Sequence, residues 1–314
     1  MRNLITGGCG FIGSNLIDRL IKNGEFVICI DDLSSGFYEN ITKYLKHKNF
    51  IFIKNDITNP IKTSLKIDRI WHLACPASPK HYQLDPIKTS KTNFIGTLNI
   101  LKLAQKYKSK ILLASSSEVY GNPKQHPQEE NYFGYVNPIG LRSCYDEGKR
   151  IAESLFFNYH RTYRLDIKVA RIFNTYGPMM SLYDGRVISN FICQSIQKKP
   201  LTIYGNGSQS RSFCYVDDLI DGLIKLMDSN QTGPINLGNP EEISIMNLAY
   251  LINDKVGNVF QYEYMTLPKD DPIKRKPNIS KAINSINWSP NYSLSVGLDL
   301  TIKYFQNLLN SKRK

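Results

Sequence analysis

A glycine-rich segment near the start of the chain restricts what this sequence can fold into more than any other feature. Gly7, Gly10 and Gly13 recur at intervals of three residues, between an apolar run that ends at Thr6 and an amphipathic stretch that begins at Phe11. Glycine at a strand-to-helix turn permits positive φ, close approach of the backbone to a pyrophosphate, and close packing of the helix on the strand. The N-terminal N–H groups of the helix would point at phosphate oxygens. The segment therefore predicts the first turn of a dinucleotide-binding βαβ unit.

Acidic residues follow the next two predicted strands. Asp31 lies 24 residues beyond Gly7, where a carboxylate can accept hydrogen bonds from the ribose hydroxyls of adenosine. A carboxylate at this position also repels a 2′-phosphate, so we expect the cofactor to be NAD and not NADP. Asp56 follows the third strand and is expected to reach the adenine.

The first half of the chain alternates β-rich runs with helical patterns, which is typical of βαβ units and a parallel sheet. The predicted strands are residues 3–6, 25–30, 49–54, 69–74, 110–115 and 165–173, and the predicted helices are residues 11–23, 89–107 and 141–163. Beyond about residue 175 the alternation loosens, with helices expected at 185–197, 216–229, 243–256 and 294–309, and strands at 201–204 and 234–237. We predict an α/β fold: a doubly wound parallel sheet of the Rossmann type over residues 1–175, and a smaller C-terminal α/β substrate domain over residues 176–314. The boundary is expected to be blurred, because segments of the two parts interleave.

Composition excludes several classes of protein. The chain holds no apolar run of about 18 residues, the length that a membrane span requires, and its start shows no signal-peptide pattern, so we expect a cytoplasmic protein without a membrane partner. The six cysteines are scattered and lack metal-ligand spacing, so we expect no metal and no disulfide. The net charge is +13, but the lysines are spread over predicted helices and loops without a nucleic-acid motif, so no nucleic-acid partner is expected.

A tyrosine and a lysine four residues apart, Tyr145 and Lys149, lie on one face of the helix predicted over residues 141–163. A phenol with a pKa of about 10 is a poor base at neutral pH. A nearby ammonium group and a positively charged nicotinamide ring would lower that pKa. The tyrosinate could then take a proton from a substrate hydroxyl as hydride leaves for NAD. Because ordinary helix faces show the same spacing, the pair alone leaves a purely structural role open.

Polar residues also follow the strand predicted over residues 110–115. Ser116, Ser117 and Glu118 would lie at the carboxyl end of this strand, where parallel sheets bind ligands. Ser116 could hydrogen-bond the reacting hydroxyl, and Glu118 could act as a second acid or base. Capping of the strand end and a solvated charge are the structural alternatives. The glycine-rich segment and the pair Tyr145 and Lys149 favour the functional interpretation.

Longer blocks of sequence carry a resemblance to a known family. They are residues 74–83, 88–93, 137–150, 170–178, 184–187, 200–213 and 275–279. From Thr6 to about Tyr304 the chain resembles the UDP-glucuronate decarboxylases of the extended short-chain dehydrogenase/reductase superfamily. The resemblance implies NAD-dependent conversion of UDP-glucuronate to UDP-xylose through a 4-keto intermediate, with NAD regenerated in each cycle. It also implies a homodimer that forms through helices near residues 92–107 and 141–163.

The resemblance further implies a set of site residues. The implied catalytic residues are Tyr145, Lys149, Ser116, Ser117, Glu118 and Arg275, of which Ser117, Glu118 and Arg275 assist at carbon 5. The implied cofactor contacts are Gly7, Gly10, Phe11, Ile12, Gly13, Asp31, Asp32, Ser35, Gly36, Asp56, Ile57, Leu73, Ala74, Asn93, Tyr145, Lys149, Thr175 and Arg186. The implied substrate contacts are Lys91, Asn174, Arg186, Tyr204, Arg211 and Arg275. Arginine suits this role because it offers a bidentate fork to phosphate and carboxylate oxygens.

The chain departs from the family pattern at some positions, and other functions stay open. Ser116 stands where threonine is expected, which keeps the hydroxyl, and Met179 stands where arginine is expected, which removes one cation. A UDP-sugar 4-epimerase has no use for an acid at Glu118, and a 4,6-dehydratase generally has aspartate where this chain has Ser117. Release of a UDP-4-keto-pentose also remains open. A non-catalytic NAD-binding regulator is disfavoured, because the hydroxyl of Ser116 and the tyrosine–lysine pair are all retained.

Overall fold

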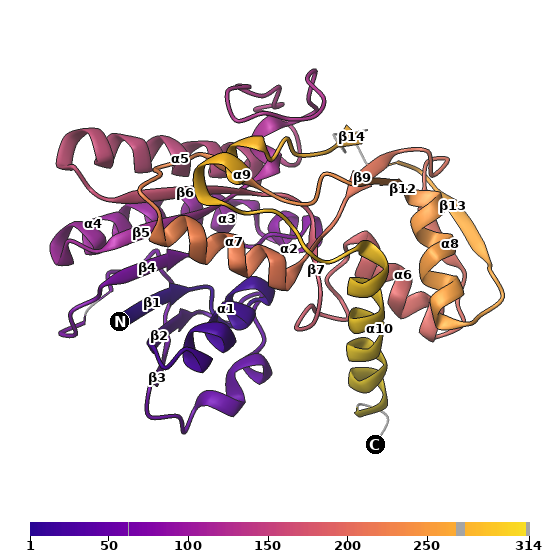
Figure 1. Ribbon diagram of the computed structural model, residues 1–314, viewed down its shortest axis with the longest axis horizontal. Coiled ribbons are helices and arrows are strands. Elements are labelled where there is room, and N and C mark those ends of the chain that lie inside the picture. The colour runs from indigo at the N-terminus through magenta and orange to yellow at the C-terminus, as the bar shows by residue number, and fades with distance from the viewer. Residues whose placement is uncertain (62, 268–273, 312–314) are drawn as a thin grey trace.

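A parallel sheet of seven strands forms the centre of the computed structural model, which describes residues 1–61, 63–267 and 274–311 (Figure 1). The strands lie in the order β11-β6-β5-β4-β1-β2-β3. Their bounds are β1 (Arg2–Thr6), β2 (Phe26–Asp31), β3 (Phe50–Lys54), β4 (Arg69–His72), β5 (Lys110–Ser116), β6 (Ile167–Ile172) and β11 (Ile235–Leu237). The order reverses on either side of β1, and doubly wound sheets bind ligands at the carboxyl ends of the strands at such a point. The predicted Rossmann-type sheet is confirmed.

Helices cover both faces of this sheet (Figure 1). On one face lie α1 (Phe11–Lys22) and α7 (Val216–Asp228), and on the other lie α4 (Thr97–Tyr107) and α5 (Ser143–Tyr163). The central strands are consequently buried on both sides: Leu4 and Ile5 are adjacent in β1, have no exposed surface, and belong to different apolar clusters. A strand that packs on both faces needs continuous apolar residues, and this is the pattern that made β1 recognisable in the sequence.

The helix predicted over residues 89–107 forms as three consecutive segments. α3 (Pro86–Lys91) leads into a π-helical turn (Thr92–Gly96), which continues into α4. Asp85 caps the start of α3 by accepting a hydrogen bond from the backbone N–H of Lys88 at 2.9 Å. π-Helical turns occur frequently at functional sites, and this one faces the cavity described below.

The C-terminal part of the chain is divided between the sheet and a second unit. β11 and α7 follow residue 175 but pack with the seven-stranded sheet. The second unit holds α6 (Val187–Ile196), α8 (Ile245–Val256) and α10 (Leu294–Ser311), which Figure 1 shows to one side of the sheet. Its short sheets pair β8 (Leu201–Tyr204) with β13 (Tyr262–Met265), β7 (Thr175–Tyr176) with β10 (Cys214–Tyr215), and β9 (Ser210–Ser212) with both β12 (Glu242–Ser244) and β14 (Lys274–Arg275).

The sequence did not reveal most of these short elements, nor α2 (Pro79–Leu84) and α9 (Ser280–Ile286), because elements of two to seven residues are too short to show a clear hydrophobic period. One of them matters for the site: β14 pairs in parallel with β9 and aligns Arg275 with Arg211. Within the part of the chain that the structure describes, no helix has the length and apolarity needed to cross a membrane.

Candidate active site

A cavity of about 780 Å³ runs along the carboxyl edge of the sheet. The ends of β1, β2, β4 and β5 line one side of it, and Tyr204, Arg211 and Arg275 from the second unit line the other. Residues far apart in the sequence therefore face one cavity. The glycine-rich turn and the tyrosine–lysine pair both line this cavity.

The glycine-rich turn forms a cradle that a side chain would fill. Gly7 has φ of +73°, and a Cβ atom there would lie 2.8 Å from the backbone of Ala74. A Cβ atom on Gly13 would lie 2.2 Å from the carbonyl oxygen of Gly7. Because α1 begins at Phe11, its free N–H groups open directly into the cavity. The turn thus fits a pyrophosphate bound at a helix N-terminus.

Asp31 closes this cradle at the end of β2. Its carboxylate accepts hydrogen bonds from the backbone N–H groups of Cys9, at 2.9 Å, and Leu33, at 2.8 Å. Burial raises the pKa of Asp31, and these two donors only partly offset the effect. Further donors, such as the hydroxyls of a ribose, would stabilise the charged form. The carboxylate therefore lies at the end of β2 in the cavity lining, and its role in adenosine recognition stays a prediction.

Tyr145 and Lys149 lie on the same face of α5, at the centre of the cavity. The Nζ atom of Lys149 lies 5.7 Å from the centre of the Tyr145 ring and donates a hydrogen bond to the carbonyl oxygen of Ala114 at 2.9 Å. Burial raises the pKa of Tyr145, and a hydrogen bond with Ser116 lowers it. Burial is the largest of these influences and leaves the pKa of Tyr145 above its usual value, so the lowering that we predicted requires the positive charge of a nicotinamide ring.

A cluster of charged residues lies beside this tyrosine. Glu118 Oε2 accepts hydrogen bonds from Nη2 of Arg142 at 2.6 Å and from Nη2 of Arg275 at 3.0 Å. Arg275 also donates to the carbonyl oxygen of Ser117 at 2.5 Å, and its side chain is only 1% exposed. Burial opposes ionisation of Glu118, but the charges of Arg275 and Arg142 outweigh it and hold its pKa below the usual range. Glu118 is therefore a carboxylate at neutral pH.

Asp146 adds a second acid to the cluster from the next residue of α5. Its Oδ2 atom lies 3.8 Å from Nε of Arg142, one helical turn earlier. Burial, and then the charge of Glu118, raise the pKa of Asp146 to about 7, against the opposing charges of Arg142 and Arg275. The cluster thus holds a fixed anion, a carboxyl group that titrates near neutrality, and two buried guanidinium groups.

Comparisons with known proteins place this arrangement in a family. The family model for GDP-mannose 4,6 dehydratases matches residues 4–301. UDP-glucuronic acid decarboxylase 3 of Arabidopsis thaliana is 51% identical over 314 residues, which cover all of this chain and 91% of that protein. UDP-glucuronic acid decarboxylase 1 of Xenopus tropicalis is 50% identical over 305 residues, covering 97% of this chain and 72% of that one. The chain belongs to the UDP-glucuronic acid decarboxylase family.

Solved structures of related enzymes share the fold of this family member. A UDP-glucose 4-epimerase of Thermotoga maritima in complex with UDP-glucose superposes with a TM-score of 0.92, at 30% identity, and covers 98% of this chain and 100% of its own. The UDP-glucuronic acid 4-epimerase of Bacillus cereus, in complex with UDP-glucuronic acid and NAD, superposes with a TM-score of 0.87, at 29% identity, with the same coverage.

The cavity gathers nearly all the site residues that the sequence predicted for this family. All the implied catalytic residues line it, and so do the implied cofactor contacts apart from Asn93. Asn93 is buried and donates its amide hydrogens to the carbonyl oxygen of Thr89, at 3.1 Å, and to Sγ of Cys75, at 3.2 Å. Its neighbour Thr92 lines the cavity instead.

All but one of the implied substrate contacts line the same cavity. Asn174, Arg186, Tyr204, Arg211 and Arg275 line it. Lys91 is exposed on α3 and lies outside the cavity lining. Arg186 forms a bidentate ion pair with Asp184, at 2.5 and 2.7 Å, so a substrate phosphate would have to share this guanidinium group. Met179, where the family pattern has a cation, also lines the cavity, with φ of +70°.

Two site residues escaped the prediction although they lie in recognised blocks. Arg142 precedes Tyr145 by three residues, and its pairing with Glu118 follows from their positions immediately before α5 and after β5. Tyr82, from the short helix α2, stacks on the ring of Tyr145 at 5.0 Å and 12°. Within the described part of the chain its buried hydroxyl has no hydrogen-bond partner. The signal for both was their position within family-specific blocks, since neither residue follows a general catalytic spacing.

Proposed function

We propose that this protein decarboxylates UDP-glucuronate to UDP-xylose, with NAD as a cofactor that is regenerated in each cycle. The observation that carries the proposal is a single cavity in which the tyrosine–lysine pair lies beside Glu118, Arg142 and Arg275. The first group suits oxidation of a sugar hydroxyl, and the second suits recognition of an adjacent carboxylate. Family membership and about 50% identity to decarboxylases support the same reaction.

The residues around Tyr145 carry out the oxidation at carbon 4. Bound NAD would accept hydride from carbon 4 and later return it, and its positive ring would help to lower the pKa of Tyr145. Tyr145 takes the proton of the carbon-4 hydroxyl, while Ser116 holds that oxygen by a hydrogen bond. Lys149 is fixed by the carbonyl oxygen of Ala114 and stabilises the tyrosinate. The resulting 4-ketone is β to the carboxylate on carbon 5, so it accepts the electron pair that loss of carbon dioxide leaves.

The charged cluster handles the carboxylate and the later protonation at carbon 5. Arg142 and Arg275 both contact Glu118 through their Nη2 atoms, so a substrate carboxylate bound by these atoms would share them with Glu118. The Nε atom of Arg275 has no hydrogen-bond partner among the described residues. Because Glu118 rests as a carboxylate, we assign it the ordering of a water molecule that delivers the proton to carbon 5, and not the role of a resting acid.

4-Epimerase activity is the second candidate function, and an observation on a related structure supports testing it. The Bacillus cereus 4-epimerase is itself in complex with UDP-glucuronic acid, so binding of a uronic acid does not separate the two activities. The identity of the reaction product must therefore distinguish a decarboxylase from a 4-epimerase.

A product assay tests the proposal. The protein is incubated with NAD and UDP-glucuronate labelled in the carboxyl carbon, and released carbon dioxide, nucleotide sugars and absorbance at 340 nm are measured together. We expect carbon dioxide and UDP-xylose in equal amounts, with no net accumulation of reduced cofactor. UDP-galacturonate without carbon dioxide, or no turnover, would refute the proposal. Carbon dioxide with UDP-4-keto-pentose and equimolar reduced cofactor would show that the cycle is open.

We further propose that the enzyme is a homodimer that works in the cytoplasm. Phe94, Ile95 and Ile151 are large apolar side chains on the π-helical turn and α5, each more than a third exposed. These two elements pack together and lie in the helices that the family resemblance assigns to the dimer contact. Light scattering is expected to give twice the chain mass of 35.9 kDa, and Phe94→Glu is expected to shift it toward the monomer. A wild-type monomer would contradict the proposal.

A further inference from the structure

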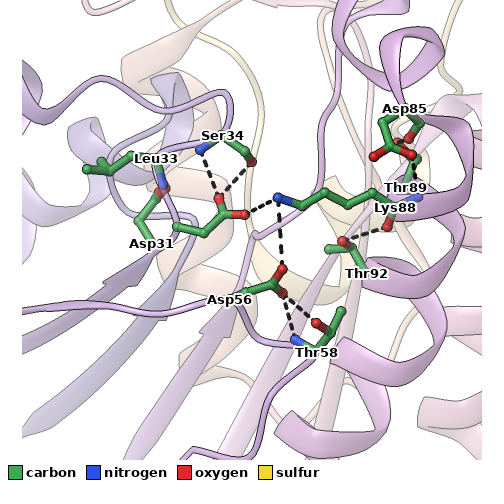
Figure 2. A network of polar contacts seen from close by, with 10 residues as sticks. Asp31, Leu33, Ser34, Asp56, Thr58, Asp85, Lys88, Thr89 and Thr92 are labelled. Atoms are coloured by element: carbon green, nitrogen blue, oxygen red, sulfur yellow. Dashed lines mark hydrogen bonds and ion pairs between the residues drawn. The ribbon is translucent and has the colours of Figure 1, made fainter.

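A lysine on α3 connects two acidic turns at the adenosine end of the cavity (Figure 2). The Nζ atom of Lys88 donates a hydrogen bond to Oδ2 of Asp32 at 2.6 Å and lies 3.9 Å from Oδ2 of Asp56. Asp32 follows β2 and Asp56 follows β3, so the lysine joins the ends of two neighbouring strands to a helix that comes about thirty residues later.

Each carboxylate is held so that one oxygen is left for this lysine. Oδ1 of Asp32 accepts hydrogen bonds from the backbone N–H and hydroxyl of Ser34, at 2.9 and 2.6 Å. Oδ1 of Asp56 accepts the same pair of bonds from Thr58, both at 2.8 Å. Figure 2 shows the side chain of Lys88 extended from the helix toward Asp56. The two turns fix the carboxylates, and Oδ2 of each is turned toward one ammonium group.

Lys88 lies at the rim of the cavity and does not fill it. Asp32 and Asp56 line the cavity with their neighbours Ser34 and Ile57, whereas Lys88 is outside the lining. Its backbone is fixed by the cap that Asp85 provides and by the hydroxyl of Thr92, which donates to the Lys88 carbonyl oxygen at 2.9 Å. The lysine therefore forms a bridge over the adenosine end, anchored on a helix start that does not depend on the cofactor.

The bridge contributes little to folding. The side chains of Lys88, Asp32 and Asp56 are 36%, 24% and 27% exposed, and ion pairs this close to solvent stabilise a protein only weakly. The main effect of the bridge is on the charge at this end of the cavity. Without the ammonium group, two carboxylates at the adenosine end would carry uncompensated charge toward a cofactor that itself bears two phosphate charges.

We propose that Lys88 is a positioning residue that holds the adenosine end of the cavity closed and slows the release of the cofactor. The benefit of slow release rests on the proposed function. In a cycle that regenerates NAD, loss of the reduced cofactor after oxidation would leave the 4-keto sugar unreduced. The contacts of Lys88 with both carboxylates tie α3 to the turns that follow β2 and β3, so loss of these contacts would free the turns that line this end of the cavity.

The experiment compares Lys88→Met with Lys88→Arg and with Lys102→Met, a matched change at an exposed lysine of α4. The rate of NAD dissociation is measured without substrate, by chasing protein-bound NAD with excess ADP-ribose. We expect Lys88→Met to raise this rate about three- to tenfold, Lys88→Arg to restore most of the difference, and Lys102→Met to leave it unchanged. Added salt should speed release from the wild type and from Lys88→Arg, but have less effect on Lys88→Met, because salt screens exposed charges.

A second measurement reads the consequence for turnover. During reaction with UDP-glucuronate, Lys88→Met should accumulate more reduced cofactor per UDP-xylose formed than the wild type, in proportion to its faster release. An unchanged dissociation rate in Lys88→Met overturns the inference, and so does an equal rise in Lys88→Met and Lys88→Arg. Faster release together with no reaction on UDP-glucuronate would sustain the bridge and refute the proposed function, so the two failures are distinct.

Discussion

The two ends of the cavity are built in different ways. At the cofactor end, Gly7, Gly13 and Asp31 lie within one βαβ unit, and recognition depends on backbone geometry and strand ends. At the sugar end, Glu118 and Arg275 are 157 residues apart and meet only because β14 pairs with β9. The first end is local in sequence, and the second exists only after the second unit has packed on the sheet.

Because of this difference, the residues of the two ends differ in how freely they can be substituted. A turn in which Gly7 and Gly13 are each required by a backbone contact has few alternatives, which suits the binding of a dinucleotide such as the NAD in the Bacillus cereus 4-epimerase structure. A cluster of long side chains from separate elements can change by single substitutions without altering the fold. The solved epimerase structures fit this view, because they share the fold at 29–30% identity while acting on different sugars.

The largest expected effect comes from removing the hydroxyl of Tyr145. Tyr145→Phe should lower kcat by about 10³-fold, within the range of general acid–base catalysis, and leave the Kd for NAD within about twofold of the wild type. Stopped-flow kinetics and calorimetry check the two values. A mutant that kept a tenth of the wild-type kcat would show that another group takes the carbon-4 proton.

Arg275→Met tests the sugar end. Loss of the guanidinium group should lower kcat/KM by about 10²–10³-fold, as for the loss of one hydrogen-bond donor that stabilises a reacting anion, with no change in the Kd for NAD. Lys276→Met is the control, because Lys276 pairs with Glu242 at 3.7 Å, outside the cavity lining. If Arg275→Met weakened NAD binding as strongly as turnover, the two ends would not be independent.

The sequence predicted the cofactor end in more detail than the sugar end, for physical reasons. The glycine spacing, the strand ends and the helix start lie close together, so Gly7 and Asp31 could be assigned before the fold was known. Arg275 was assigned only through the family resemblance, since no local pattern links it to Glu118. Arg142 and Tyr82 were missed because their roles arise from pairing and stacking across elements, and Asn93 was chosen where its neighbour Thr92 faces the cavity.

Gly13→Ala tests the cofactor end in the same way. Its new Cβ atom would meet the carbonyl oxygen of Gly7 at 2.2 Å, so the turn must open. We expect the Kd for NAD to rise by about tenfold or more, which corresponds to about 1.4 kcal/mol. Gly24→Ala is the control: Gly24 has φ of +77°, and a Cβ atom there meets nothing within 4 Å. It should therefore lower the melting temperature without changing the Kd. An equal change of Kd in both variants would contradict a specific role for the turn.

Asp146→Asn is expected to have the smallest effect, one that depends on pH. Burial raises the pKa of Asp146 to about 7 in the folded protein, whereas an aspartate in an unfolded chain ionises near about 4. Between these two values the folded state keeps a proton that the unfolded state has released, so this residue makes the wild type less stable as pH rises from about 4 to about 7. Above about 7 both states are ionised and the contribution is constant.

Asparagine does not titrate, so the melting temperature of Asp146→Asn relative to the wild type should rise from pH 5 to pH 8. Since Asp146 contacts Arg142 and lies outside the cavity lining, kcat should change only severalfold. A melting-temperature difference that stayed constant between pH 5 and pH 8 would show that Asp146 is ionised throughout, and the sugar end would then hold two fixed anions against its two guanidinium groups.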